Sequence, residues 1–479
     1  LKPHFSIKDF VFSLFTGKKD KIETYDPNRL VNMAGDLSEE NKVWKVFTTA
    51  NEGQTVFSAS SETVDVTNTP KTLVLQALLP SGLEMYKTFT FYPDSYQVDF
   101  EVKLLNRSGQ PIEINPGINF GAGNDSIDRE SLPKPKIGVS FIDDKFETYD
   151  DDDFKSPKET KEPLEIRNSL WTGVMDTYFL SVVKKADGTT FNSKMTALDS
   201  VLNGSDIKIP KLEYVDKVLI LNNNQEYHQT FSLFMGPKIE SVLKKFEFNL
   251  SKAMDLGFFE ILAYPMLAML RWLQGYVVNW GVAIILLTII VRTAMFPLAY
   301  KSMVSMNKMK LLNPKISAIR EKYKKDKERM NKEIMQFYSQ HKVNPVGGCL
   351  PMLMQIPIFF ALYEALLPAI ELRHTPFFLW MDDLSAYDYT LILPILMGAT
   401  MFLQQSLTPN PAMDPNQARM MKFMPIMMIM FFFTMPSGLV LYWLVSNVIS
   451  VLQQVAFNRL TPAVPVEAPI KGKGGKKNK

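Results

Sequence analysis

Residues 279–298 read NWGVAIILLTIIVRTAMFPL, and this stretch decides the fold class of the chain. Arg292 is the one charged side chain in it. A helix of about 20 apolar residues is long enough to cross the roughly 30 Å hydrocarbon core of a bilayer. The stretch therefore predicts a membrane span, whose bounds we place at residues 276–298.

Further apolar tracts follow this span, and the last of them is too long for one crossing. Residues 423–455 are nearly all apolar, but Pro436-Ser437-Gly438 breaks the helix pattern within them. We therefore expect five spans, at residues 276–298, 349–367, 391–407, 423–435 and 438–456. The fourth covers only about 20 Å, so the bilayer should thin beside it.

The first half of the chain has a different pattern, and 479 residues imply two or more domains. Polar and apolar residues alternate with period two, as in residues 96–104 and 227–233, which is typical of half-buried antiparallel strands. Turn formers recur at residues 106–109, 186–188 and 203–204. We therefore predict an all-β sandwich domain over residues 1–250.

Three further segments complete the predicted organisation. Residues 251–274 are apolar but interrupted by charges, which favours an amphipathic helix lying in the membrane interface. Residues 300–348 are rich in helix formers and predict a helical hairpin turning near Asp326. Residues 461–479 form a basic tail. The basic surface of hairpin and tail is consistent with simple solvation, with contact to RNA-rich ribosomes, or with anionic lipid.

The loops between spans predict the orientation of the chain. Arginine and lysine concentrate in cytoplasmic loops of membrane proteins. The first loop is strongly basic, the next is acidic, and the tail is again basic. The cations of the first loop are Lys301, Lys308, Lys310, Lys315, Arg320, Lys322, Lys324, Lys325, Lys327, Arg329, Lys332 and Lys342. The hairpin and tail are therefore expected in the cytoplasm and the β-domain in the periplasm of a two-membrane bacterium. We also expect an export signal or sixth helix before Leu1.

The composition argues against several function classes. One cysteine and four scattered histidines do not favour a disulfide framework or a zinc centre, and we expect neither metal nor cofactor. The spans hold no chain of acidic residues typical of proton pumps and no nucleophile pair typical of intramembrane proteases. The acidic run at residues 150–153 lacks the ligand spacing of an EF-hand loop, so a solvated loop is the better interpretation than a calcium site.

Polar residues recur at one depth in four of the predicted spans. Because polar groups in lipid must face protein or water, they predict one hydrated, inward-open cavity that holds the charge of Arg292. Two alternatives stay open: Arg292 could snorkel to the headgroups, and the amides and hydroxyls could serve only as hydrogen bonds between helices. The polar residues are Thr288, Arg292, Gln355, Thr400, Gln404, Ser446, Asn447, Ser450, Gln453 and Gln454, with Trp443 on the same stripe but farther out.

The region from Asp255 to Phe457 resembles the YidC/Oxa/Alb family of membrane protein insertases, most closely its bacterial branch. Four strings carry the resemblance, in family order: NWGVAIILLTIIVRTAMFPL (279–298), NPVGGCLPMLMQIPIFFALY (344–363), LPILMGATMFLQQ (393–405) and MPSGLVLYWLVSNVISVLQQ (435–454). The resemblance implies an insertase without enzymatic turnover, in which Arg292 marks a hydrophilic groove lined by Thr288, Gln355, Tyr442, Trp443 and Ser446. With the residues above, the expected groove also includes Thr400, Gln404, Asn447 and Ser450.

The resemblance also implies partners and a fold for the first domain. The expected partners are nascent membrane proteins, the ribosome through the hairpin and tail, components of the Sec translocon, and lipid. We expect the chain to act as a monomer in the bacterial inner membrane, alone or with Sec. The β-domain is expected to be a sugar-mutarotase-like supersandwich. A solute channel and a periplasmic scaffold are the two competing functions.

Overall fold

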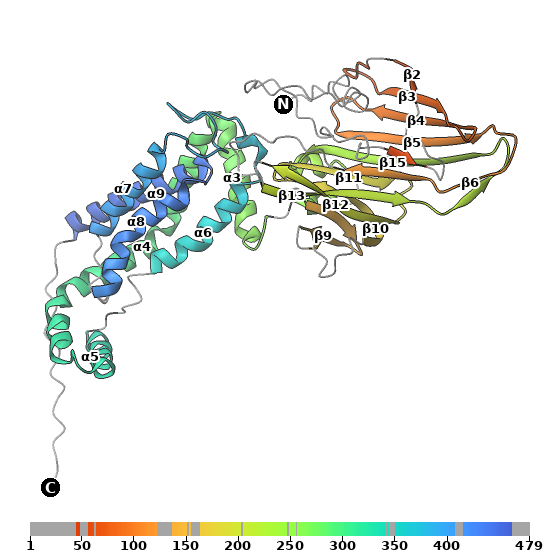
Figure 1. Ribbon diagram of the computed structural model, residues 1–479. Coiled ribbons are helices and arrows are strands. Elements are labelled where there is room, and N and C mark those ends of the chain that lie inside the picture. The colour runs from red at the N-terminus through yellow and green to blue at the C-terminus, as the bar shows by residue number, and fades with distance from the viewer. Residues whose placement is uncertain are drawn as a thin grey trace, which may run out of the picture. The chain divides into compact units, whose positions relative to one another are not determined.

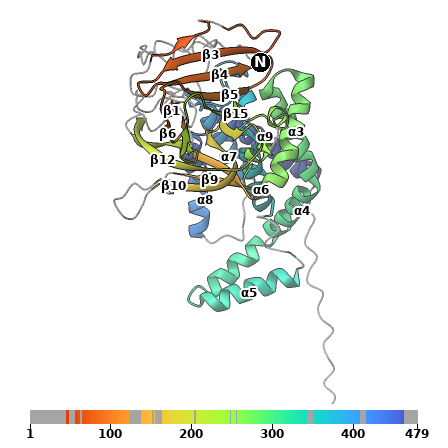
Figure 2. The same cartoon turned by 90° about the vertical axis from the view of Figure 1, so that its right-hand side faces the viewer.

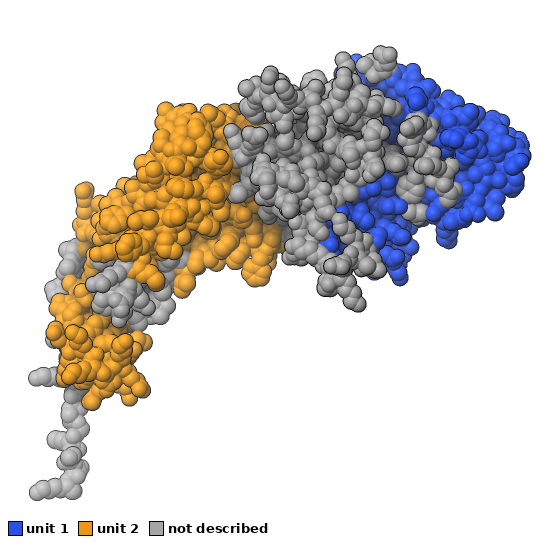
Figure 3. Space-filling view, in the orientation of Figure 1, with its two compact units in different colours: residues 1–129, 133–255, 368–370 blue, residues 130–132, 256–367, 371–479 orange. Residues whose placement is uncertain are grey.

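The computed structural model describes residues 45–47, 56–61, 64–121, 137–150, 153–154, 163–202, 205–246, 249–254, 256–341, 343, 350–407 and 415–461. The chain divides into two compact units, coloured in Figure 3. The first comprises residues 1–129, 133–255 and 368–370, and the second residues 130–132, 256–367 and 371–479. The first holds the strands and the second the long helices (Figure 1), so we call them the β-unit and the helical unit.

The β-unit consists of strands that mostly pair with their neighbours in antiparallel fashion. Their bounds are β1 Lys45–Phe47, β2 Ser58–Ala59, β3 Lys71–Leu78, β4 Leu83–Phe91, β5 Gln97–Asn106, β6 Ile112–Ile114, β7 Gly117–Gly121, β8 Ile137–Ile142, β9 Lys145–Tyr149, β10 Leu164–Met175, β11 Phe179–Lys185, β12 Phe191–Leu202, β13 Ser205–Val215, β14 Leu219–Leu221 and β15 Glu226–Pro237. A short helix, α2 (Glu240–Leu243), and a 3₁₀ turn, Leu250–Ala253, follow.

The two alternating segments of the sequence form paired strands. Residues 96–104 lie mostly in β5 and residues 227–233 in β15, and the two strands pair antiparallel with Phe100 opposite Phe231. Along β5 every second side chain is buried, as the alternation requires when one face of a strand meets a core. Of the three predicted turns, residues 203–204 lie outside the described residues.

The sheet branches at β10. Its residues 164–169 pair with β12, whereas residues 169–175 pair on the same edge with β8. The register shifts around Asn168, which has a φ of 54°, and a bulge of this kind bends a strand. In the described residues thirteen strands join in the order β1-β7-β13-β12-β10-β11-β15-β5-β4-β3-β2, with β8 and β9 on the branch, while β6 and β14 form a separate pair.

The sheet folds over its own core. Tyr214 of β13 contacts Phe231 of β15 edge to face, with ring centroids 5.4 Å apart, although three strands separate them in the sheet. Phe231 also stacks on Phe100 at 6.4 Å. One hydrophobic cluster therefore joins both ends of the strand order, so that two layers of strands share one interior.

The helical unit contains seven helices in its described part, six of them apolar and the seventh, α5, polar. They are α3 Glu260–Val277, α4 Trp280–Lys322, α5 Lys327–Gln340, α6 Leu350–Leu366, α7 Ile392–Leu407, α8 Pro415–Phe432 and α9 Ser437–Leu460. A 3₁₀ turn at Ile370–Leu372 follows α6. The apolar helices pack mainly as the pairs α7 with α9, α4 with α9, α3 with α4 and α3 with α6.

The first predicted span begins later than the sequence suggested. Residues 276 and 277 still belong to α3, which ends because Val278 adopts a left-handed conformation with a φ of 60°. α4 then begins at Trp280, since the Asn279 side chain accepts a hydrogen bond from Val282 N at 3.1 Å. The predicted interfacial segment, residues 251–274, is likewise a 3₁₀ turn followed by α3 instead of one helix.

The span and the first arm of the hairpin are one continuous helix. α4 runs through residue 298, where the span was expected to end, and passes Pro297 and Pro314 without a break before ending at Lys322. Asp326 caps α5 by accepting from Arg329 N at 3.0 Å. Figure 2 shows α5 folded back along α4, and a small apolar cluster joins them: Met309, Leu312, Ile316, Tyr338 and Val343.

Two helices of the described part are long and apolar enough to cross a bilayer, α4 and α9. Three shorter apolar helices accompany them, at Leu353–Leu366, Ile392–Leu407 and Met420–Phe432. At 1.5 Å per residue the shorter ones cover about 20 to 24 Å, less than a hydrocarbon core of roughly 30 Å. The five predicted spans thus coincide with five apolar helices of unequal length.

The two-layered core predicts a specific weakness of the β-unit. Replacing Phe231 by Ala (Phe231→Ala) should destabilise the β-unit by about 3 to 5 kcal/mol, because its ring is 1% exposed and contacts both layers. Denaturant titration of the full chain in detergent, with proteolysis of the β-unit as readout, measures the loss. The exposed Val56→Ala is the control, and equal midpoints for both variants would contradict this account of the core.

Candidate functional site

The helical unit exposes many apolar side chains and buries several polar ones among its apolar core residues. Many large apolar side chains on its helices are exposed, among them Met430 of α8 at 67% and Leu452 of α9 at 63%. In contrast, Thr288, Ser446 and Asn447 are buried between the helices. Soluble proteins seldom expose contiguous apolar patches of this kind, whereas a lipid solvent requires the inverted arrangement. The surface of the helical unit therefore suits a bilayer, and its core includes a small set of polar side chains.

Arg292 contacts one of these polar side chains. Its guanidinium donates to the Ser446 hydroxyl from Nε at 2.6 Å and also from Nη2, which joins α4 to α9. In the part of the chain that the structure describes, no carboxylate pairs with Arg292. A single neutral hydroxyl leaves most of its five donors and its full charge uncompensated, which is costly away from water.

A chain of hydrogen bonds extends from Arg292 to a third helix. Ser446 bonds to the Tyr442 hydroxyl, one turn earlier in α9, and that hydroxyl accepts from Gln355 Nε2 of α6 at 2.8 Å. We call Arg292, Ser446, Tyr442 and Gln355 the polar network. The start of α4, the start of α9 and the end of α6 lie on the same side of the unit. Measured from these ends, Arg292, Ser446 and Gln355 lie about 14 to 18 Å along their helices, and Tyr442 lies about 8 Å along α9.

The other expected groove residues satisfy their polar groups more locally. Thr288, Thr400 and Ser450 each donate to a carbonyl of their own helix, at 2.7, 2.8 and 2.9 Å. Asn447 donates across to Met397 O of α7 at 3.4 Å. These contacts agree with the alternative that small polar side chains serve helix packing. Gln404 is half-buried on α7.

Trp443 lies in different surroundings from the polar network. Its ring packs on Phe359 of α6 and Phe432 of α8, with centroids 4.8 and 5.3 Å apart, and those two rings lie 6.0 Å apart. This aromatic cluster joins three helices on the side where α8 ends and α9 begins. The stripe of α9 therefore has an aromatic part and a hydrogen-bonding part.

Residues 371–391, here the cap loop, close that side, and sequence reasoning did not single them out. Ser437 N donates to Ala386 O at 2.7 Å and Gly438 N to Leu384 O at 2.9 Å, so the cap loop satisfies the free amides that begin α9. A Cβ at Gly438 would lie 3.1 Å from Leu384 O, which explains the glycine. The sequence does contain a signal for an ordered loop here, namely two short Asp-x-Ser/Thr motifs at 383–385 and 388–390, which are typical of turns.

The aspartates of both motifs hold the cap loop in shape. Asp388 accepts from Leu393 N at 2.7 Å and thereby caps α7. Asp383 accepts from the Ser385 amide and hydroxyl, both at 2.7 Å, and pairs with His374 Nδ1 at 3.2 Å. Burial alone would raise the pKa of Asp383, but the hydrogen bonds from His374 and Ser385 outweigh it and hold this pKa below its ordinary value.

Glu364, the acidic residue inside the second predicted span, has a structural partner. Its Oε2 accepts from Phe259 N at 2.9 Å, at the start of α3, where a carboxylate complements the helix dipole. Arg271 of α3 forms a second tie, with Nη2 2.9 Å from Glu371 Oε1. α3 is thereby fixed along the cap-loop side, with Trp272 and Tyr276 exposed, as in an interfacial helix.

The described residues thus place a cation behind a packed side of the helical unit. The cap loop and the aromatic cluster cover that side, and the polar network behind them holds Arg292 without an acidic partner among the described residues. Within the described residues no His, Cys, Asp or Glu group of three or more could hold a metal ion. The site offers electrostatic attraction and hydrogen bonds.

Comparison with known proteins gives two family matches. The family model described as "60Kd inner membrane protein" matches residues 272–463, and the one described as "YidC periplasmic domain" matches residues 29–269. Curated proteins called "Membrane protein insertase YidC" are similar over most of the chain. The protein from Geotalea uraniireducens is 38% identical, over 83% of this chain and 73% of its own length. That from Vibrio atlanticus is 39% identical, over 79% and 69%.

Among solved structures, a YidC insertase crystal structure with its first transmembrane domain resolved is similar. It is 20% identical, with a TM-score of 0.39, over 86% of this chain and 79% of its own.

The electrostatics of the cap loop predict a pH dependence. Because the pKa of Asp383 is lowered in the folded state, its stabilisation is fully present above the ordinary value of 3.8 and is lost as the pH falls through the folded value. Pepsin cleavage within residues 371–391 should therefore increase steeply below about pH 4. Asp383→Asn should cleave readily already at pH 5, whereas the exposed neighbour variant Asp382→Asn should follow the unaltered chain. Identical profiles for both variants would refute this role of Asp383.

Proposed function

The chain belongs to the YidC family of membrane protein insertases, and from this premise we propose that it inserts and folds membrane proteins through a hydrophilic groove centred on Arg292. The observation that carries the proposal is the Arg292–Ser446 contact, a cation held inside an apolar helical unit without an acidic partner in the described residues. The proposed activity forms and breaks no covalent bond, so it needs neither a nucleotide nor a cofactor.

We propose that the helical unit spans the bacterial inner membrane five times, with the β-unit in the periplasm. The family's periplasmic-domain model covers residues 29–269, which supports that side for the β-unit. The basic segments then lie opposite, since the hairpin and residues 461–479 carry 15 of the 16 lysines that follow residue 256, as cytoplasmic loops do. The cap loop becomes the periplasmic closure, and the groove opens toward the cytoplasm.

In this orientation the groove lowers the cost of moving a polar segment partway across. An acidic side chain that reaches Arg292 replaces a neutral hydroxyl by a carboxylate, which accepts from the guanidinium through two oxygens and also neutralises its charge. Gln355, Tyr442 and Ser446 belong to the same network, whereas Thr288, Thr400, Gln404, Asn447 and Ser450 would line the walls. Trp443 would close the groove on the periplasmic side.

The unequal helix lengths support a short remaining path. α6, α7 and the apolar part of α8 cover about 20 to 24 Å, so the bilayer must thin around them or expose their ends. A translocated segment starting from Arg292 then has less hydrocarbon to cross. Apolar spans of the substrate leave into lipid, and their partitioning drives release.

The partners follow from this mechanism. Nascent membrane proteins are the substrates, and the basic hairpin of α4 and α5 and the basic residues 461–479 would contact the ribosome. We further propose that the chain acts as a monomer, both alone and beside the Sec translocon. The two-layered β-unit fits the supersandwich arrangement that the resemblance implied.

The charge of Arg292 should select substrates. Arg292→Ala should lower the insertion of a protein with an acidic translocated tail about tenfold, because a charge-assisted hydrogen bond contributes roughly 1.5 to 3 kcal/mol, and should lower that of a neutral tail less than about twofold. Arg292→Lys should keep part of the activity. Reconstituted liposomes with protease protection of the tail measure both. Lys301→Ala, an exposed cation on the same helix, is the control, and equal loss for both tails would exclude charge attraction.

Ser446 should act through Arg292. Ser446→Ala removes the acceptor that orients the guanidinium and should lower insertion of the acidic-tail substrate a few fold. The double variant Arg292→Ala/Ser446→Ala should then be no worse than Arg292→Ala alone, since interacting residues are not additive. The same liposome assay gives all four rates. Multiplicative losses in the double variant would show that Ser446 contacts the substrate independently.

A further inference from the structure

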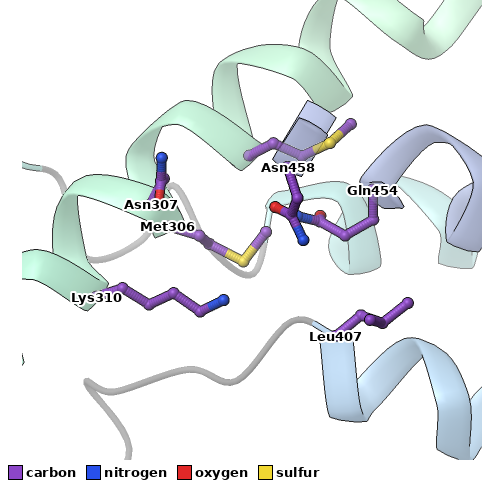
Figure 4. A pocket seen from close by; sticks show the side chains of 7 residues that line it. Met306, Asn307, Lys310, Leu407, Gln454 and Asn458 are labelled. Carbon is purple, nitrogen blue, oxygen red and sulfur yellow. The ribbon is translucent and has the colours of Figure 1, made fainter. Parts of the chain in front are cut away.

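A second polar site lies at the far end of the helical unit from the cap loop. α4, α7 and α9 line a small hollow that is partly open to the outside, shown in Figure 4. Its lining residues are Met303, Met306, Asn307, Lys310, Leu407, Gln454 and Asn458. None of them belongs to the polar network, although Gln454 continues the polar stripe of α9 toward the end of that helix. We call it the inner pocket.

The inner pocket offers unused donors. The Lys310 side chain extends into the pocket toward Leu407 and Asn458 (Figure 4). Asn458 Oδ1 accepts from Gln454 Nε2 at 2.9 Å, which leaves the two hydrogens on Asn458 Nδ2 for another acceptor. In the part of the chain that the structure describes, no carboxylate pairs with Lys310 and no acceptor bonds Asn307. A cation with amide donors is a site for an anion with several oxygens.

The depth of the inner pocket matches a lipid headgroup. Measured from Ser437 at the cap-loop end, Gln454 and Asn458 lie about 26 and 32 Å along α9. This brackets the inner boundary of a hydrocarbon core of roughly 30 Å. Side chains of a helix point toward its N-terminus, so the Lys310 ammonium reaches back from the cytoplasm to that level.

The remaining lining favours lipid over an acidic peptide. Met303 is buried, and Met306 and Leu407 complete an apolar wall beside the donors. A phospholipid presents this sequence of groups, a phosphate followed by glycerol and acyl carbons, whereas an acidic peptide at this depth would have to bury backbone amides. Negatively charged lipids of the cytoplasmic leaflet are attracted by about 1 kcal/mol for each nearby lysine.

We propose that the inner pocket binds the phosphate group of an anionic phospholipid from the cytoplasmic leaflet. Lys310 supplies the charge and Asn458 donates to a phosphate oxygen, while Met303 and Leu407 contact the carbons next to the phosphate. The proposal rests on the orientation proposed above, and it assigns to the second half of α4 and the end of α9 a role separate from substrate insertion.

Native mass spectrometry of the full chain tests this proposal, with phosphatidylglycerol, phosphatidylcholine and inorganic phosphate as probes. The unaltered chain should prefer phosphatidylglycerol, and Lys310→Gln should weaken that binding about fivefold. Lys308→Gln removes an exposed charge two positions away, outside the pocket, and should have no effect. Lys310→Arg should retain the preference, which separates loss of charge from a folding defect.

Several outcomes would overturn the proposal. Equal binding of the two lipids, or equal loss in Lys310→Gln and Lys308→Gln, would show that general surface charge and not the pocket attracts lipid. Displacement of phosphatidylglycerol by millimolar inorganic phosphate would indicate a free-phosphate site, and displacement by an acidic peptide would indicate a site for protein.

Insertion assays separate this proposal from the proposed function. In phosphatidylcholine liposomes Lys310→Gln should insert substrates like the unaltered chain, and the stimulation by added phosphatidylglycerol should be reduced in this variant. If the lipid preference fails while Arg292→Ala still discriminates between tails, the inner pocket proposal alone is wrong. If the lipid preference holds while Arg292→Ala does not discriminate, the charge-attraction account is wrong and the lipid site stands.

Discussion

The hydrogen bond from Arg292 to Ser446 is the constraint on which the helical unit depends. A guanidinium in the middle of a lipid-facing helix is tolerated only if protein or water receives it, and here one hydroxyl of α9 does so. Tyr442 and Gln355 extend the contact to α6, so three helices are arranged around one charge. An acidic partner in the protein would neutralise that charge permanently. A neutral one holds the side chain in place and leaves its attraction available.

The side of the helical unit under the cap loop is held together by backbone hydrogen bonds and aromatic packing. The cap loop satisfies the first amides of α9 with the Ala386 and Leu384 carbonyls and caps α7 with Asp388, so its backbone is tied to helix ends that would otherwise be unpaired. The aromatic rings of Phe359, Phe432 and Trp443 fill the space behind it. Water is therefore excluded on that side by packing and backbone hydrogen bonds together.

The sequence predicted features that depend on local pattern. Alternation located β5 and β15, and apolar runs located α6, α7 and α9 to within a residue or two at most ends. The predicted bounds of the first span were wrong at both ends. Its start was wrong because the conformation of Val278 ends α3, and its end was wrong because two prolines do not break α4. The register shift at Asn168 depends on how β10 pairs with β12, and the cap loop contacts α9 across many residues of sequence. Both features involve segments that are distant in the sequence, so no local pattern reveals them.

The sequence shows which polar residues lie within apolar helices, but it does not show their partners, because those depend on how each helix is rotated about its axis. Thr288 and Thr400 turned out to bond their own helices, and Arg292 to bond across. The difference follows from reach: a threonine hydroxyl meets the carbonyl one turn back, but a guanidinium extends too far from its helix to do so. Long polar side chains therefore connect the helices of this unit, and the short ones allow them to approach closely.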